Sequence, residues 1–404
     1  MAGRRRAWRV GRVRVVALWL LPVTLGSLVA CGGGRPETDT ASADVRQLLD
    51  RRAAAVLAGD EPAYALTGAR AEFTRLRALP LAAWSYRLTA LRRTGGDGAT
   101  ADVELSYRVE GIDKAPVKAG RTLRLTERDD GKWYVDADKP ARRTGQQLWD
   151  QGTVQAVRGA HSLVLGVGQP TESLRRYAGL ADRAVPAVTQ AWGGTWTKRV
   201  VVLVPKSLDG MAGLLGSPAS AYRGIAAVTT GETGGSAKAP ADRIIVNPEA
   251  YAVLGNFGKQ VVLTHETTHV ATRTATSAAT PLWLSEGYAD WVGYRSTGRT
   301  AVEAASELAR AVASGDVPDA LPEDADFGFD GDAGKLARAY EGGWLACRLI
   351  ADRWGEVRLG EFYRAVGAHG TRAGAVEGAM AGVLGTTPGE FTVLWRDYLR
   401  AQLG

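Results

Sequence analysis

The spacing of apolar residues changes from helical to strand-like within residues 44–141. Apolar residues first recur three and four positions apart, which predicts a long helix over 45–57 and a short one over 73–79. The period then becomes two in four runs, which begin at Trp84, Val103, Leu123 and Trp133. Such alternation predicts antiparallel strands with one buried face, and Asp130-Gly131 is typical of a hairpin turn. The segment is therefore expected to be an α+β domain.

Residues 153–404 combine short strand patterns with long helical ones. Apolar or β-branched runs predict buried strands over 161–165, 199–204, 224–230 and 243–247. Helices are predicted over 171–192, 301–313, 336–353, 362–366 and 391–399. We therefore expect a second α+β domain with a small sheet and a largely helical C-terminal half, joined to the first by a linker over 142–152.

The N-terminal residues 1–30 have the composition of a signal peptide. They hold six arginines, no acidic residue, and an apolar stretch from Val15 to Val29 that is short for a membrane-spanning helix. The stretch ends at Leu28-Val29-Ala30-Cys31, which resembles a bacterial lipobox. That resemblance implies cleavage before Cys31 and a lipid on Cys31 that anchors the protein on the outer face of the cytoplasmic membrane. The alternative is an uncleaved N-terminal anchor with an incidental cysteine, and both place the body of the protein outside the cytoplasm.

The same segment changes the meaning of the charge and the cysteine count. The formal net charge is +7, but the six arginines of residues 1–30 account for most of it and leave the rest near +1, so no nucleic-acid partner is indicated. Cys31 and Cys347 are the two cysteines, so lipidation of Cys31 leaves no intramolecular disulfide. Cys347 lies on an apolar helical pattern and is predicted to be an inert buried thiol. Residues 31–43, rich in glycine and polar residues, are predicted to be a flexible tether.

The strongest chemical signal is His265-Glu266-Thr267-Thr268-His269. Two histidines four residues apart share one face of a helix and can bind one metal ion through two imidazole nitrogens. Apolar residues flank the run on both sides, which favours a buried helix over a solvated one. A catalytic zinc needs a third protein ligand, and Glu286, in a second short helical run, is the candidate. Asp290, four residues later, could accept the second N–H of a zinc-bound histidine.

These residues resemble the gluzincins, the thermolysin and aminopeptidase group of zinc metallopeptidases. The run Trp283-Leu284-Ser285-Glu286-Gly287-Tyr288-Ala289 is most similar to the W-L-x-E-G-x-A motif of compact peptidase MA-like domains. The resemblance implies one zinc per chain, held by His265, His269 and Glu286, with Glu266 as general base and acid and Asp290 orienting His265. It departs from the aminopeptidases in the short gap over 270–285 and in the lack of a G-x-M-E-N stretch. An exopeptidase specificity is therefore not supported, and an endopeptidase acting on peptides or proteins is expected.

The resemblance also implies parts of the site that the motif itself does not contain. A peptidase MA-like domain has a tyrosine early in the helix after the zinc site, which here is Tyr340; it either donates its hydroxyl to the substrate or packs against Trp344. An edge strand holds the extended substrate, with 244–246 as the candidate and 226–228 nearly as good. The first domain resembles the nuclear transport factor 2-like or cystatin-like cone folds in the order of its elements.

Other readings of the sequence stay open. The zinc domain could be structural or inactive, in an envelope lipoprotein that serves as a binding or assembly factor, although an intact Glu266 counts against this. A hydrolase of a non-peptide amide in the cell wall would use the same residues. His161 is predicted to be a packing histidine, and the acidic stretch 321–334 a solvated loop, because it lacks the frame of a calcium site. The sequence does not indicate an oligomeric state.

Overall fold

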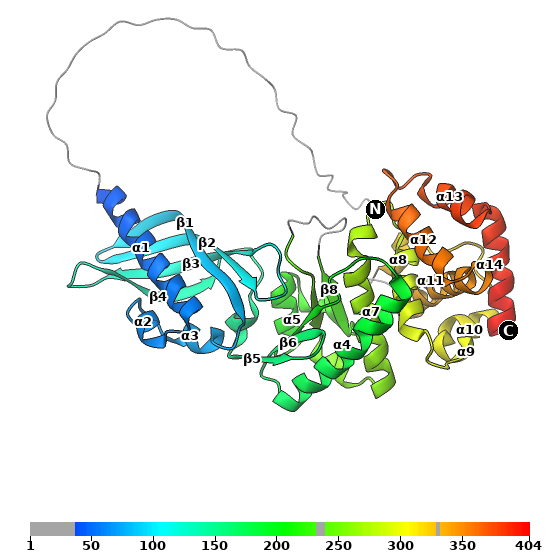
Figure 1. Ribbon diagram of the computed structural model, residues 1–404, viewed down its shortest axis with the longest axis horizontal. Coiled ribbons are helices and arrows are strands. Elements are labelled where there is room, and N and C mark those ends of the chain that lie inside the picture. The colour runs from blue at the N-terminus through cyan, green and yellow to red at the C-terminus, as the bar shows by residue number, and fades with distance from the viewer. Residues whose placement is uncertain (1–36, 232–238, 329–331) are drawn as a thin grey trace, which may run out of the picture. The chain divides into compact units, whose positions relative to one another are not determined.

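The protein is described here from a computed structural model, which covers residues 37–404 except 232–238 and 329–331 (Figure 1). Residues 42–404 form one compact unit. Within the described part of the chain, no helix is long and apolar enough to cross a membrane. The predicted signal peptide, the lipobox and Cys31 lie outside the described residues.

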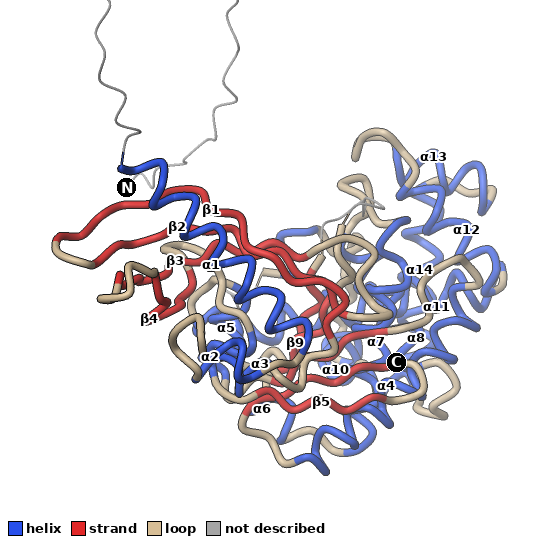
Figure 2. Tube along the Cα trace, turned by 60° about the vertical axis from the view of Figure 1, so that its left-hand side comes forward, coloured by secondary structure: helices blue, strands red, loops and turns tan. Residues whose placement is uncertain are grey.

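The first sheet is an antiparallel meander in the order β1-β2-β3-β4. Its strands are β1 (Leu81–Gly95), β2 (Gly98–Val109), β3 (Val117–Glu127) and β4 (Trp133–Pro140). Before it come α1 (Glu37–Ala58), α2 (Glu61–Ala65) and α3 (Ala71–Leu76), and α1 crosses one face of the sheet in both views (Figures 1 and 2). The alternating apolar side chains, such as Leu105 and Leu123, are buried. The predicted order of helices and strands is therefore confirmed.

The tether prediction is wrong for residues 37–43, because α1 begins at Glu37. Ala41 and Val45 are buried on this helix, so burial reaches further towards the N-terminus than the sequence pattern suggested.

The second sheet has five strands in the order β5-β6-β7-β9-β8. These are β5 (Val154–Arg158), β6 (Ser162–Val167), β7 (Val200–Val204), β9 (Arg243–Val246) and β8 (Ala227–Thr230). β6, β7 and β9 are parallel, whereas β5 and β8 run antiparallel to their neighbours. One face packs against α4 (Thr171–Trp192) and α7 (Asn256–Thr272), in a core that includes Val164, Val202 and Leu263. The short helices α5 (Leu208–Leu215) and α6 (Pro248–Ala252) lie in the connections.

This topology corrects the choice of edge strand. β9, which contains the preferred 244–246, lies between β7 and β8 and is hydrogen-bonded on both sides. β8 is the edge strand, and it overlaps the second candidate, 226–228. Strand order is a property of non-local pairing, and both runs have the same apolar character in the sequence.

The C-terminal half is helical, as predicted. Its helices are α8 (Leu282–Tyr294), α9 (Ala301–Ala304), α10 (Ser306–Ala313), α11 (Ala333–Trp354), α12 (Glu356–Gly367), α13 (Ala375–Ala379) and α14 (Pro388–Leu403). They share one apolar core, which includes Trp344, Phe362 and Trp395. The single helix predicted over 301–313 is wrong, because the chain breaks at Ala305. The carboxylate of Glu341 accepts the N–H groups of Glu307 and Leu308 and so provides α10 with its own N-terminal cap.

Helices α8 and α11 approach each other closely, and this contact positions the site. A Cβ atom on Gly287 would overlap the carbonyl group of Gly343, and a Cβ on Gly343 would lie 2.7 Å from the carbonyl oxygen of Trp283. Glycine at both positions lets the two backbones meet. The glycine that follows Glu286 thus allows α11, with Tyr340 in its first turns, to pack beside Glu286.

Candidate metal centre

Helix α7 carries both histidines and is largely buried. Leu263, Thr267, Thr268 and Ala271 are at most 1% exposed, although four of the buried residues on this helix are threonines with a polar hydroxyl. Thr264, Thr268 and Thr272 donate their hydroxyls to main-chain carbonyls four residues earlier, at 2.8, 2.8 and 3.0 Å. These three hydroxyls are therefore satisfied within the helix, which can lie between the sheet and α8, whereas the buried hydroxyl of Thr267 has no hydrogen-bond partner among the described residues.

His265, His269 and Glu286 meet at one point. The Nε2 atoms of His265 and His269 are 3.0 Å apart, and Oε2 of Glu286 lies 3.3 Å from the first and 3.4 Å from the second. Their three ligand atoms form a group that could hold a metal ion, and it is the only such group among the described residues. The structure thus brings together the two residues of the helical motif and the glutamate from the next helix.

The spacing of these three atoms fits zinc. Zinc binds imidazole nitrogen and carboxylate oxygen at about 2.0–2.2 Å, usually with tetrahedral geometry. Ligand atoms around such an ion lie about 3.3–3.6 Å from one another, and the three separations here are close to that range. Three protein ligands leave the fourth position of a tetrahedron free, as in catalytic rather than structural zinc sites.

The charges around the site favour a cation. Burial alone lowers the pKa of His265, but the carboxylates of Asp290 and Glu286 outweigh burial and hold that pKa well above its ordinary value. Burial raises the pKa of Glu286, yet the imidazoles of His269 and His265 outweigh it and bring the pKa below its usual range. The buried carboxylates therefore stabilise positive charge at the rings, which a metal ion can supply in place of protons.

Asp290 lies behind His265. Its Oδ1 atom accepts a hydrogen bond from Nδ1 of His265 at 2.8 Å, so that Nε2 of the same ring faces His269 and Glu286. This bond selects the tautomer with a free lone pair on Nε2 and holds the ring plane. The geometry matches the orienting role that the resemblance implies for Asp290.

Glu266 stands beside the metal group without joining it. The residue is 6% exposed, and Oε2 accepts a hydrogen bond from Oγ1 of Thr229 at 2.6 Å. The same hydroxyl lies 3.1 Å from the main-chain oxygen of Glu266. Thr229 belongs to the edge strand β8, so one side chain holds the carboxylate of Glu266 to the sheet. Sequence reasoning missed Thr229, because the strand and the helix that carry these two residues are separated by the loop and strand β9.

Tyr340 lies near the acidic groups of the site. Burial raises the pKa of Tyr340 well above its ordinary value, and the nearby carboxylates of Glu286, Asp290 and Glu266 raise it further. The hydroxyl therefore stays protonated and can act as a hydrogen-bond donor. Its ring packs edge-on against Phe327, with centroids 5.1 Å apart, whereas the ring of Trp344 lies tilted against that of Tyr294. The aromatic partner of Tyr340 is therefore Phe327, and not Trp344 as in one of the two alternatives that the sequence left open.

The remaining sequence candidates lie away from this centre. His161 is outside the metal group, and its main-chain N–H donates to Asp182. Cys347 is fully buried and its pKa is raised by burial, as predicted for an inert thiol. In the acidic stretch, Asp324 and Asp326 pair with Arg372 and Lys335, while Asp330 is outside the described residues.

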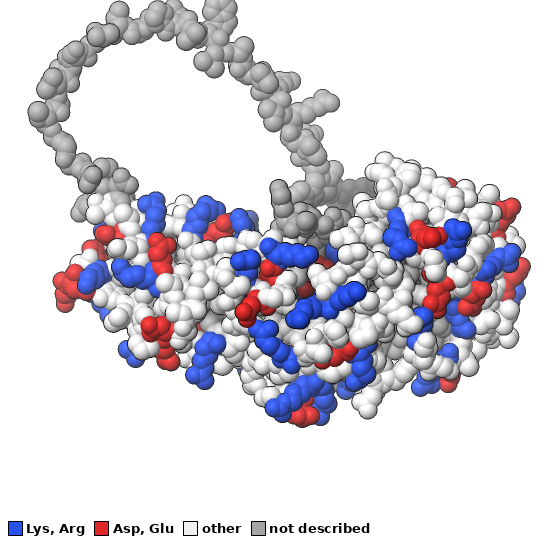
Figure 3. Space-filling model, viewed as in Figure 1, with Lys and Arg blue, Asp and Glu red and all other residues white. Residues whose placement is uncertain are grey.

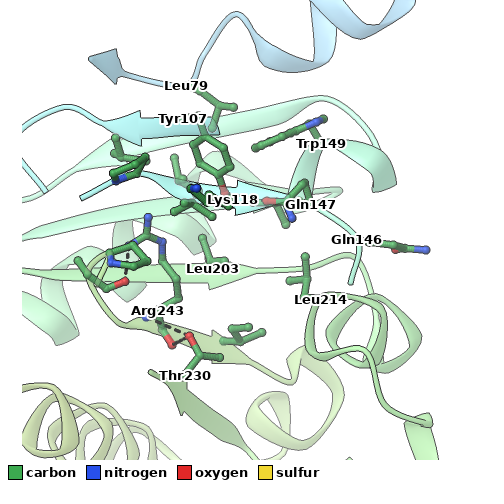
Figure 4. Close-up of a pocket in the computed structure, with 18 of the residues that line it drawn as sticks. Leu79, Tyr107, Lys118, Gln146, Gln147, Trp149, Leu203, Leu214, Thr230 and Arg243 are labelled. Atoms are coloured by element: carbon green, nitrogen blue, oxygen red, sulfur yellow. Dashed lines mark hydrogen bonds between the residues drawn. The ribbon is translucent and has the colours of Figure 1, made fainter. Parts of the chain in front are cut away.

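A cavity of about 780 Å³ lies between the two sheets, and it is not the metal site (Figure 4). Tyr107, Trp149, Leu203 and Leu214 line it, together with Arg243, whose guanidinium is paired with the buried Asp113 at 2.7 Å. None of the three metal-ligand residues is among those that line it. The described residues that line the cavity are mainly apolar.

Comparisons with known proteins found a similar structure but no related sequence. No family model matches the chain, and no curated protein matches it. Among solved structures, an M1 zinc metallopeptidase from Deinococcus radiodurans, crystallised as a variant bound to the substrate Tyr-Ser-Ala, is similar with a TM-score of 0.33 and 12% sequence identity. The match covers 81% of this chain and 96% of that one. Because the TM-score is low, the functional interpretation rests on the geometry of the site.

Proposed function

We propose that this protein is a zinc-dependent metallopeptidase that cleaves peptide bonds within polypeptides. The observation that carries the proposal is the meeting of His265, His269 and Glu286 beside a fourth group, Glu266, that is not a ligand. A structural zinc site is closed by four protein ligands and needs no free carboxylate. Three ligands with an adjacent carboxylate suit hydrolysis better than a binding or assembly role.

The chain's own residues divide the work of hydrolysis. A zinc ion held by His265, His269 and Glu286 would polarise the substrate carbonyl and lower the pKa of a water molecule towards about 7. The carboxylate of Glu266 accepts the proton of the attacking water and then delivers it to the amide nitrogen as the C–N bond breaks. The Tyr340 hydroxyl donates a hydrogen bond to the negative charge that develops on the carbonyl oxygen.

The open edge of β8 supports a peptide as the substrate. The main-chain N–H of Asn247 donates to the oxygen of Ala226 at 2.9 Å, and the register continues with Val228 opposite Ile245 and Thr230 opposite Arg243. In an antiparallel pair, main-chain groups alternate between the two sides of a strand. Those of Ala227 and Thr229 therefore point away from β9, to the free edge, where an extended peptide can add as another strand.

We further propose where the enzyme is located and what its first domain does. The lipobox-like residues 28–31 support a lipid anchor on Cys31 and a location on the outer face of the cytoplasmic membrane. The helices and antiparallel meander of residues 44–141 support a nuclear transport factor 2-like cone that serves as a spacer, substrate-presenting or partner module. The mature enzyme would then act on proteins or peptides outside the cytoplasm.

Removal of the metal tests the proposal directly. Dialysis against a chelator is expected to abolish hydrolysis of casein and of a quenched fluorescent peptide. The reason is that His265, His269 and Glu286 form the only group of described residues that could hold a metal ion. One equivalent of zinc should restore the activity. The zinc content of each sample is measured by atomic emission alongside its activity. Full activity in protein shown to be free of metal would contradict the proposal.

The hydroxyl of Thr229 is expected to contribute to catalysis through its hydrogen bond to Glu266. Thr229→Val keeps the shape of the side chain but removes the hydrogen bond to Glu266, and a bond to a charged group contributes about 1.5–3 kcal/mol. The turnover number should fall by about tenfold or more, with a smaller change in KM, since the main chain of β8 still binds the peptide. Thr229→Ser retains the hydroxyl and is the matched control. Equal turnover in the valine and serine variants would show that Thr229 only packs.

A further inference from the structure

A second pocket, of about 670 Å³, lies between α4 on one side and α6 with the start of α7 on the other. Three cationic side chains line it, Arg176, Arg183 and Lys259, and no carboxylate is among the described residues that do so. Tyr177 and Tyr251 form part of the wall, with ring centroids 5.0 Å apart. The volume is in the range of small-molecule sites, about 300–1,000 Å³.

Each of the three cations is oriented by a neutral oxygen atom. Arg176 donates to the hydroxyl of Ser173 at 3.2 Å, Arg183 to the side-chain oxygen of Gln260 at 2.9 Å, and Lys259 to the carbonyl of Ala252 at 3.4 Å. These bonds hold the side chains without neutralising them. The neighbouring Arg175, by contrast, lies 3.6 Å from a carboxylate oxygen of Glu172.

The support for Arg183 is itself fixed from two sides. The Gln260 side chain that accepts its hydrogen bond donates to the carbonyl of Leu180 at 3.1 Å and to the hydroxyl of Thr264 at 3.2 Å. The orientation of Gln260, and with it of the guanidinium, is therefore determined before any ligand binds. A donor that is already in place loses little conformational entropy on binding.

The start of α7 adds to the positive potential. Asn256, the first residue of this 17-residue helix, lines the pocket, and the preceding Gly255 has no side chain to cap the free N–H groups. No acidic residue occurs in the first turn. Uncapped N–H groups at a helix N-terminus favour an anion, here next to three unneutralised side chains. Figure 3 shows lysine and arginine side chains gathered on the part of the surface where Figure 1 places α4.

We infer that this pocket binds a phosphate-bearing ligand, with the phosphate held by Arg176, Arg183 and Lys259 and the attached group lying against Tyr177 and Tyr251. Three like charges around one cavity repel one another, and a phosphate group, with one or two negative charges and more acceptor oxygens than a carboxylate, can neutralise them and accept hydrogen bonds from all three. The tyrosine faces suit a sugar, glycerol or apolar group. The phosphate could come from a free metabolite or from a lipid headgroup, and this inference does not depend on the peptidase activity.

Calorimetric titration of the purified protein with three probes tests the inference. The probes are inorganic phosphate, glycerol phosphate and the phosphodiester glycerophosphoglycerol, each at low and at physiological ionic strength. At least one is expected to bind, and more weakly as salt is added. Preference for inorganic phosphate or for the monoester glycerol phosphate would indicate a free metabolite, and preference for the phosphodiester would indicate a lipid headgroup. If none of the three binds at low ionic strength, the inference is wrong.

A pair of variants separates the pocket from general surface charge. The double variant Arg176→Gln, Arg183→Gln should weaken binding by at least about tenfold, since each lost guanidinium removes charge-assisted hydrogen bonds. Arg175→Gln removes the same charge one residue away, from a side chain that does not line the pocket, and should bind like the wild type. Equal weakening in the two proteins would overturn the assignment. Because Arg176 and Arg183 are exposed, melting temperatures near that of the wild type are expected in both.

Discussion

Glu266→Gln is expected to retain one zinc per chain and to lower the turnover of peptide substrates by about 10²–10⁴-fold. Glutamine has nearly the shape of glutamate, and its amide oxygen can still accept the hydrogen bond from Thr229 that glutamate accepts at 2.6 Å. It cannot take a proton from water at neutral pH. Because His265, His269 and Glu286 are unchanged, the metal group keeps its three ligands. The loss would therefore be confined to the proton-transfer step.

Zinc content and steady-state kinetics should be measured on the same preparations. Glu356→Gln is a suitable control, because it removes a carboxylate from a surface ion pair with Arg295, far along the chain from the zinc ligands. It is expected to keep both zinc and activity. A Glu266→Gln protein with the turnover of the wild type would exclude Glu266 as the general base. Zinc in both proteins with activity in neither would favour the binding-factor interpretation or a narrow specificity.

Glu286→Gln is expected to lose the metal itself. The substitution removes the only anionic group among the three ligands and leaves two imidazoles, to which zinc binds less tightly. Zinc content after dialysis should fall well below one per chain, and peptide hydrolysis should fall with it. Unlike Glu266→Gln, this variant should lose the metal and the activity together.

Thermal unfolding gives a second readout for Glu286 that does not depend on catalysis. Zinc at about 100 times its dissociation constant stabilises the folded state by about 2.7 kcal/mol. Addition of zinc to the apo wild type should therefore raise the melting temperature by several degrees, whereas Glu286→Gln should show little response. A normal zinc-dependent increase in this variant would show that Glu286 is not a ligand. Glu356→Gln, tested in parallel, should respond as the wild type does.

Much of the metal centre was predictable because its signals are local. His265 and His269 are four residues apart on one helix, so the period of the α-helix alone places both imidazoles on one side. Glu286 and Asp290 have the same spacing on the next helix, and their position could be inferred from one run of residues. The bounds of α4 were likewise predicted over 171–192, because 22 residues give several turns of apolar periodicity.

Errors arose where one element depends on another that is distant in the sequence. The break at Ala305 follows a cap from Glu341, which lies on another helix. Residues 37–43 are helical although their composition is typical of a tether. Short helices such as α6 and α13 have too few turns to show a period. In each case the local sequence pattern was not sufficient, either because a contact with another element determined the structure or because the element was too short to show a period.

The sequence by itself therefore indicated the α+β class and the candidate residues of the metal centre, because the two histidines with Glu266 lie in one helical run and Glu286 lies in the next. Only the tertiary structure decided that β8 rather than β9 is the open edge, that Thr229 holds Glu266, and that Arg176, Arg183 and Lys259 line one pocket. Strand order and side-chain contacts between elements arise from packing over long sequence separations. No periodic pattern along the chain records which surfaces will meet.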